Sequence, residues 1–184
     1  YEVMLFVHPG PLDRTTDSAP WNAGDAIWDA SGSGAFCSTV VGGLNGAGHY
    51  LLTAGHCGNR NWKNADPSRI VGARLPSSIH APSFGHSGWD MQLLAANGGS
   101  SDIFWKGAST REYVAAAASP TQGDPICGEG AFGLESCGVI SDPDASICLS
   151  IDPFNGSCDE VLLNAFIVPG EVPTHGDSGG PMVQ

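Results

Sequence analysis

The chain has 184 residues, enough for one or two compact units with a sizeable core. Only 14% of the residues are charged, while Gly and Pro number 26 and 13, which favours a turn-rich all-β protein over a helical bundle. The formal net charge of −12 leaves no basic surface to displace counterions, so we expect neither nucleic acid nor a membrane as a partner.

The N-terminal stretch predicts a short strand followed by a tether. Tyr1–Val7 is β-branched and aromatic enough to pair with a sheet edge, and the prolines after it end the strand. Asp13–Pro20 is polar and predicts a linker. Residues 1–20 are therefore either the end of a pro-segment or an N-terminal extension, and both interpretations stay open.

A hairpin is predicted next. Two β-prone runs, 35–42 and 49–54, flank a turn at 44–48 that contains Asn-Gly, the strongest short-range hairpin signal. Further strands are expected at Ile70–Leu75 and Met91–Ala96, with a turn at Asn97–Ser101.

The second half continues the pattern of short strands. Arg111–Ala117 predicts a strand despite its alanines, since the run is short and ends at Ser-Pro. Cys148 and Cys158 flank a turn sequence, so a disulfide that closes this hairpin is expected. Val161–Val168 predicts the strand that leads toward the C-terminal motif. Six cysteines, an even number, indicate a disulfide framework and an oxidising compartment.

Three motifs carry the chemistry. Thr174–Pro181 (THGDSGGP) frames a serine with glycines, which lets the hydroxyl protrude and backbone N–H groups face an oxyanion. Leu52–Cys57 (LTAGHC) supplies a histidine, and Gly88–Leu94 (GWDMQLL) supplies an aspartate. In this order and local sequence they resemble the chymotrypsin-like serine peptidases, most closely the bacterial streptogrisin and α-lytic protease branch.

The resemblance begins near Gly24 and implies an all-β fold of two antiparallel barrels with the active site between them. The expected first barrel spans residues 21–105, and the second spans residues 106–184. Family members run on for several tens of residues after the serine motif, so we expect the second barrel to be incomplete in this sequence and the activity to be weak. The resemblance also implies two disulfides, Cys37–Cys57 and Cys127–Cys137.

By the same resemblance, Ser178 is the nucleophile, His56 the general base and then acid, and Asp90 the carboxylate that orients the imidazole. The backbone N–H groups of Gly176 and Ser178 form the oxyanion hole. Asp177 shapes the loop. In the bacterial branch an arginine after the first cysteine of the second disulfide pairs with this aspartate, but Gly128 stands there, so another donor is needed.

Candidates for the specificity pocket are Val172, Pro173 and His175. Val172 occupies the position where trypsin-like members carry an aspartate, which argues against Arg or Lys and favours an apolar residue before the cleaved bond. No metal or other cofactor is expected, because the remaining histidines match no metal motif: His8, His49, His80 and His86.

These inferences predict a secreted, monomeric serine endopeptidase that takes peptide or protein substrates. The alternative is a non-catalytic or inactive domain of the same fold that serves as a binding module. Labelling with a serine-directed fluorophosphonate discriminates between the two.

Overall fold

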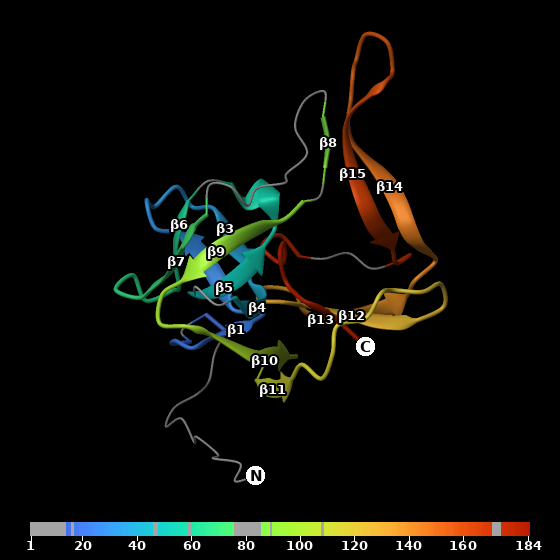
Figure 1. Cartoon of the computed structure of the whole chain (residues 1–184). Coiled ribbons are helices and arrows are strands. Elements are labelled where there is room, and N and C mark those ends of the chain that lie inside the picture. The colour runs from blue at the N-terminus through green and yellow to red at the C-terminus, as the bar shows by residue number, and fades with distance from the viewer. Residues whose placement is uncertain are drawn as a thin grey trace.

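The computed structural model describes residues 14–15, 17–45, 48–58, 60–75, 86–88, 90–107, 109–170 and 174–184. These residues form short strands joined by turns, as Figure 1 shows, and a single 3₁₀ turn at Gly55–Cys57. The strands are β1 (Trp21–Ala23), β2 (Ala26–Asp29), β3 (Phe36–Ser38), β4 (Val40–Asn45), β5 (Gly48–Thr53), β6 (Asn61–Lys63), β7 (Ile70–Arg74), β8 (His86–Gly88), β9 (Gln92–Ala96), β10 (Ser100–Lys106), β11 (Thr110–Tyr113), β12 (Pro125–Gly130), β13 (Leu134–Val139), β14 (Asp142–Ile151), β15 (Cys158–Ile167) and β16 (Met182–Val183).

Seven strands of the first half form one curled sheet in the order β3-β2-β6-β7-β9-β5-β4. Every pairing in it is antiparallel. Its inward side chains make a core around Trp62 and Leu51, both 0% exposed. Burying side chains of this size stabilises the fold by roughly 2–3 kcal/mol each.

The predicted hairpin is present and slightly tighter than expected. β4 pairs antiparallel with β5 as far as Asn45 opposite Gly48, so both strands extend into the predicted turn at 44–48. The strands at 70–75 and 91–96 are also confirmed, as β7 and β9.

The second half consists of smaller sheets. β12 lies between β13 and β16, and β14 and β15 form a long ribbon that projects from the molecule beside β8 (Figure 1). The pairing of β8 with β15 is parallel and joins residues from both sides of the expected boundary at 105/106. β1 and β10 likewise pair in parallel. The division into two domains at that boundary stays a prediction.

Two expectations about strands need correction. The predicted strand 111–117 is only Thr110–Tyr113, because its pairing with β10 ends at Tyr113, opposite Ile103. The predicted turn at 97–101 is also too long, since Ser100 already belongs to β10. In each case the partner strand decides the boundary, and local composition does not.

Three described residues of the expected extension, Arg14, Thr15 and Asp17, are hydrogen-bonded to the first sheet or to the connection between β6 and β7. The Arg14 carbonyl accepts a hydrogen bond from Ala26 N–H at 2.9 Å, and the Thr15 carbonyl accepts one from Ala65 N–H at 2.8 Å. The Asp17 carbonyl accepts bonds from the side chains of Asn64 and Arg69. The interpretations of 1–20 as pro-segment or extension are not decided by these contacts, and Tyr1–Val7 lies outside the described residues.

All six cysteines are paired as the sequence predicts. Cys37–Cys57 ties β3 to the 3₁₀ turn, Cys127–Cys137 links β12 to β13, and Cys148–Cys158 links β14 to β15. Within the described part of the chain, no helix is long and apolar enough to cross a membrane.

Candidate active site

His56 lies in the 3₁₀ turn that follows β5, and its imidazole is paired with Asp90 just before β9. The Nδ1 atom of His56 contacts Asp90 Oδ2, and the backbone N–H of His56 donates to Asp90 Oδ1 at 2.7 Å. The two contacts hold the ring and its backbone to one carboxylate. β5 and β9 are antiparallel neighbours, so the end of β5 lies beside the start of β9. The 3₁₀ turn that follows β5 and the aspartate that precedes β9 are therefore close together.

The pair shifts the proton affinity of both groups. The hydrogen bond to Asp90 raises the pKa of His56, and burial of the ring opposes this only in part. Burial of Asp90 favours its neutral form, but hydrogen bonds from the His56 side chain and backbone outweigh it and lower the pKa of Asp90. Asp90 is therefore ionised near neutral pH, and a proton on Nδ1 leaves Nε2 as the basic nitrogen.

Ser178 belongs to the serine loop, which we define as Thr174–Gly180. The Ser178 carbonyl accepts a hydrogen bond from Ser38 N–H at 2.8 Å, and the Ser38 carbonyl accepts one from the Thr53 hydroxyl at 2.7 Å. The serine loop thus rests on β3 and on the end of β5, three residues before His56. The neighbouring Cys37–Cys57 disulfide joins β3 to the 3₁₀ turn that follows β5.

Gly179 makes this close approach possible. A Cβ on Gly179 would lie 2.4 Å from Thr53 Oγ1 and 2.6 Å from both Ala54 N and Ser38 O. Its φ of +81° is also in the left-handed region that side chains disfavour. The serine loop therefore packs directly on the segment that leads into the 3₁₀ turn.

Among the hydrogen bonds of the described residues, none joins the Ser178 hydroxyl to His56. In enzymes of this kind the hydrogen bond between nucleophile and base often tightens only when substrate binds. The structure brings His56 and Asp90 into contact and Ser178 to the adjacent segment.

The N–H groups of Gly176 and Ser178 are two of the four in the serine loop that donate to no other described residue. Within the described part of the chain, the N–H groups of Gly176 and Ser178 donate no hydrogen bond, whereas Asp177 N–H between them donates to Thr174 O at 3.0 Å. Gly176 has a φ of +101°. An open pair of alternate N–H groups in a tight turn is the arrangement that an oxyanion hole requires.

Among the described residues, backbone amides and no cation hold the Asp177 carboxylate. Its Oδ1 accepts hydrogen bonds from Phe132 N–H at 2.9 Å and Gly133 N–H at 2.8 Å, and its Oδ2 accepts one from Thr174 N–H at 2.8 Å. A Cβ on either Gly130 or Gly133 would lie 2.2 Å from the nearest Asp177 side-chain atom. The missing arginine is thus replaced by a glycine-lined turn after β12, which the sequence did not reveal.

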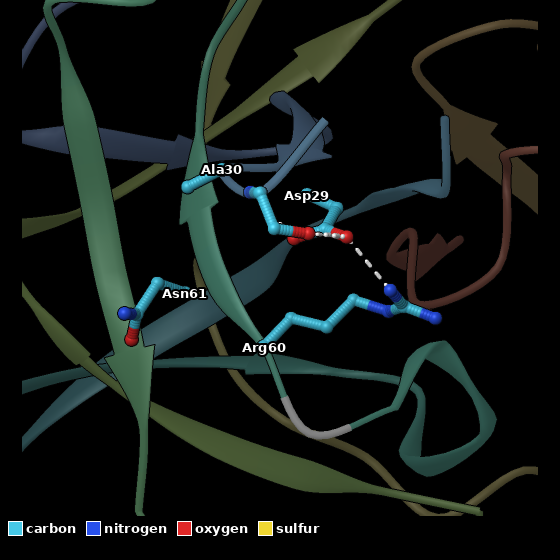
Figure 2. Close-up of a pocket in the computed structure, with 5 residues that line it drawn as sticks. Asp29, Ala30, Arg60 and Asn61 are labelled. Carbon is cyan, nitrogen blue, oxygen red and sulfur yellow. Dashed lines mark hydrogen bonds and ion pairs between the residues drawn. The ribbon is translucent and has the colours of Figure 1, made fainter. Parts of the chain in front are cut away.

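An open pocket of about 370 Å³ lies beside the 3₁₀ turn, lined by residues of the β2 end and the β6 start (Figure 2). The Arg60 guanidinium points at the Asp29 carboxylate, 2.7 Å away, and Arg60 Nε donates to Cys57 O at 3.0 Å. Hydrogen bonds from Ser31 and Ser33, together with Arg60, hold the pKa of Asp29 well below its usual range. Because the arginine is neutralised by Asp29, it mainly supports the backbone that follows His56.

The other predicted site residues are only partly described. Val172 and Pro173 lie outside the described residues. His175 is exposed, and its ring lies edge-on to Phe36 with 4.7 Å between centroids. Of the other histidines, His49 is exposed, the backbone of His86 belongs to β8, and His8 and His80 lie outside the described residues.

One group of potential metal ligands occurs among the described residues, namely Cys127, Glu135 and Cys137. The two cysteines are joined in a disulfide, so they offer no thiolate. This group therefore does not form a metal site.

Sequence reasoning missed two polar residues that assemble the site. Ser38 Oγ donates to Gly176 O at 2.9 Å and accepts from Ala131 N–H at 3.0 Å, so it links three segments. Gln92, which is 0% exposed, donates to Ala54 O at 2.7 Å. Ser38 belongs to no motif, whereas Gln92 lies within the Gly88–Leu94 motif, where a polar residue in an otherwise apolar strand is a usable signal.

Comparison with known proteins gives a likeness in structure only. No family model matches the sequence, and no curated protein matches it. Among solved structures, a glutamic acid specific serine protease with a histidine triad in substrate binding superposes with a TM-score of 0.70 at 22% identity, covering 88% of this chain and 79% of that one. The Nocardiopsis protease gives 0.66 at 18% identity, covering 88% and 77%. The Cellulomonas bogoriensis chymotrypsin gives 0.64 at 21%, covering 88% and 76%.

At these identities the likeness establishes the fold. The chain has the trypsin-like double β-barrel fold of the bacterial chymotrypsin-like serine proteases, as the sequence motifs predict.

Proposed function

We propose that this protein is a serine endopeptidase in which Ser178, His56 and Asp90 form the catalytic triad. The observation that carries the proposal is the attachment of the serine loop to the segment just before His56, whose imidazole is paired with Asp90. The fold supports it, since the structural neighbours are serine proteases.

In the proposed reaction, Ser178 Oγ attacks the carbonyl carbon of the scissile peptide bond while His56 Nε2 takes its proton. The negative charge that forms on the carbonyl oxygen is accepted by the open N–H groups of Gly176 and Ser178. Losing one such donor costs about 10²–10³ in kcat in enzymes of this kind. Asp90 fixes the proton on Nδ1 and stabilises the imidazolium.

His56 then returns the proton to the leaving amine, and the C–N bond breaks to leave an ester on Ser178. A water molecule, deprotonated by His56, hydrolyses this ester and releases the acid product. Every proton taken from a nucleophile is thus returned to a leaving group, and no cofactor takes part.

We propose an extracellular location as well, because three disulfides persist only in an oxidising compartment. The preference for an apolar residue before the cleaved bond stays a prediction, since Val172 and Pro173 lie outside the described residues. Profiling with peptide substrates that differ only in that residue, apolar against acidic, tests it.

A fluorophosphonate probe tests the proposed function. We expect one adduct per chain, located on Ser178 by peptide mass spectrometry, and its loss in Ser178→Ala. Ser157→Ala is the matched control, because Ser157 is an exposed turn residue and its replacement leaves labelling intact. Peptide binding without any labelling of the wild type would instead favour the alternative, a binding module on the same fold.

A further inference from the structure

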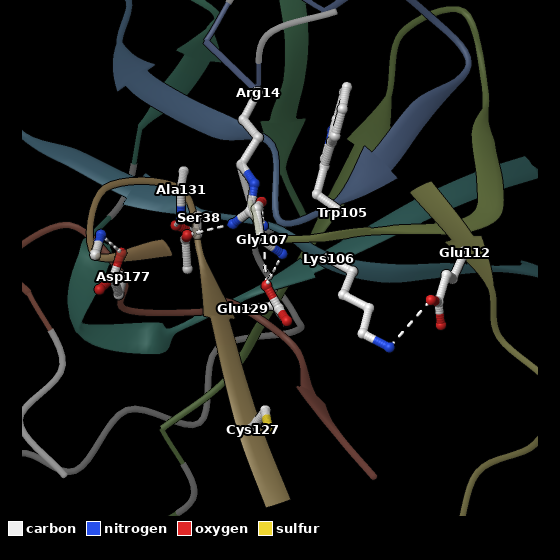
Figure 3. A network of polar contacts seen from close by, with 12 residues as sticks. Arg14, Ser38, Trp105, Lys106, Gly107, Glu112, Cys127, Glu129, Ala131 and Asp177 are labelled. Carbon is white, nitrogen blue, oxygen red and sulfur yellow. Dashed lines mark hydrogen bonds and ion pairs between the residues drawn. The ribbon is translucent and has the colours of Figure 1, made fainter. Parts of the chain in front are cut away.

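Arg14 is a buried cation far in sequence from every motif described above. Its side chain is 2% exposed, and its NH2 group lies 2.9 Å from the carboxylate of Glu129, which is 0% exposed. The guanidinium also donates to the carbonyls of Gly130 and Gly107, and Gly107 N–H donates to Glu129 at 2.8 Å. Figure 3 shows the arginine reaching down to Glu129 and Gly107, with Ser38 and Asp177 to one side.

The backbone of Arg14 is attached to the first half of the molecule, whereas its side chain contacts the second half. As described above, the carbonyls of Arg14 and Thr15 accept hydrogen bonds from Ala26 in β2 and from Ala65 between β6 and β7. Glu129 and Gly130, in contrast, form the end of β12. The Arg14 side chain therefore links the first sheet to Glu129 and Gly130, the last two residues of β12.

The end of β12 and the turn after it donate hydrogen bonds to residues on both sides of Ser178. Directly after Gly130, Ala131 N–H donates to Ser38, and the next two N–H groups, of Phe132 and Gly133, donate to Asp177. Glu129 N–H also donates to Pro181 O at 2.9 Å, on the other flank of the loop. Glu129, which Arg14 contacts, is thus bonded to the chain after Ser178, and Phe132 and Gly133, which follow within three residues of Gly130, are bonded to Asp177 before it.

A buried ion pair is a poor device for stability alone, because the cost of removing two charges from water often exceeds their attraction. The planar guanidinium is, however, well suited to fixing several acceptors in one geometry. Here it joins one carboxylate and two carbonyls that come from separate segments.

We infer that Arg14 is a positioning residue for the serine loop. The inference rests on the proposed function. Arg14 fixes the end of β12, and the turn that follows β12 fixes Asp177. Asp177 in turn sets the direction of the Gly176 and Ser178 N–H groups. Arg14, which precedes the expected first barrel, then takes part in positioning the proposed active site.

The test replaces both charges at once, with Arg14→Gln and Glu129→Gln in the full chain, so that no unpaired charge stays buried. We expect kcat to fall by about 10²-fold, as for a displacement on the order of 1 Å at a catalytic group. KM changes less than about twofold, since the oxyanion contacts act in the transition state. The control is Lys106→Gln with Glu112→Gln, which removes an exposed ion pair next to the same Gly107 and keeps wild-type kinetics.

Amide hydrogen exchange gives a readout besides activity. We expect the N–H groups of Phe132 and Gly133 to exchange faster in the double variant, while those of the β5–β9 pair are unchanged. If the double variant does not fold, Arg14→Lys takes its place. It keeps the charge but not the fork geometry, and we expect a smaller fall in kcat with faster exchange at the same two amides.

Wild-type kcat in the variant, or unchanged exchange at Phe132 and Gly133, overturns the inference. A rise in KM with kcat unchanged also overturns it, because that result places the effect in substrate binding. If the wild type itself is not labelled by the fluorophosphonate, the proposed function fails, and the exchange rates alone then decide whether Arg14 fixes the turn that holds Asp177.

Discussion

Gly179→Ala tests whether the serine loop is packed against the segment that precedes His56. The new Cβ would lie 2.4 Å from Thr53 Oγ1, and two of the three closest atoms, at 2.6 Å, belong to the backbone and cannot rotate away. Relieving such overpacking costs about 1–3 kcal/mol. A side chain at a φ of +81° adds roughly 1–2 kcal/mol. We therefore expect the free energy of unfolding to fall by about 2–5 kcal/mol.

Gly32→Ala is the matched control, since Gly32 has a φ of +85° but no atom within 4 Å of its Cβ position. It carries the backbone strain alone, about 1–2 kcal/mol. Guanidinium denaturation of the two oxidised variants measures the difference. The rate of fluorophosphonate labelling reports on the position of Ser178 relative to His56, and we expect this rate to fall in Gly179→Ala only. Equal losses of stability, or wild-type labelling of Gly179→Ala, would refute the close packing of the serine loop.

Two pH predictions follow from the shifted carboxyl and imidazole groups. The raised pKa of His56 means that the ring stays protonated, and unable to act as a base, to a pH above its ordinary 6.5, so the acidic limb of kcat/KM lies above that value. Asp90→Asn removes the carboxylate that raises the pKa of His56, so the acidic limb of kcat/KM moves to lower pH. An acidic limb that does not move contradicts the pairing of His56 with Asp90. Asp25 is fully buried, and burial followed by repulsion from Asp17 raises its pKa well above the usual value. The folded state therefore binds more protons than the unfolded state, so stability falls as pH rises above about 4. Asp25→Asn flattens this slope, and urea unfolding at a series of pH values shows whether it does.

Much of the candidate site could be predicted from the sequence because its signals are local. The glycine-framed serine, the histidine beside a cysteine and the aspartate before an apolar strand are each short motifs, and their order indicates the fold. The disulfides are local too, with separations of 20, 10 and 10 residues between the paired cysteines. Once a hairpin forms, its cysteines have few other partners in reach.

The tertiary structure alone decided what supports these groups. The donors to Asp177 are backbone N–H groups, which every residue but proline carries, so no side-chain pattern marks Phe132 and Gly133. Arg14 and Glu129 are 115 residues apart in the sequence, and the paired strands β8 and β15 are more than seventy residues apart. Neither contact has a local sequence signature. The sequence by itself thus determined the candidate catalytic groups and their order, because these depend on side-chain identity. Their positioning depends on backbone hydrogen bonds and buried charges between distant segments, which only the folded chain brings together.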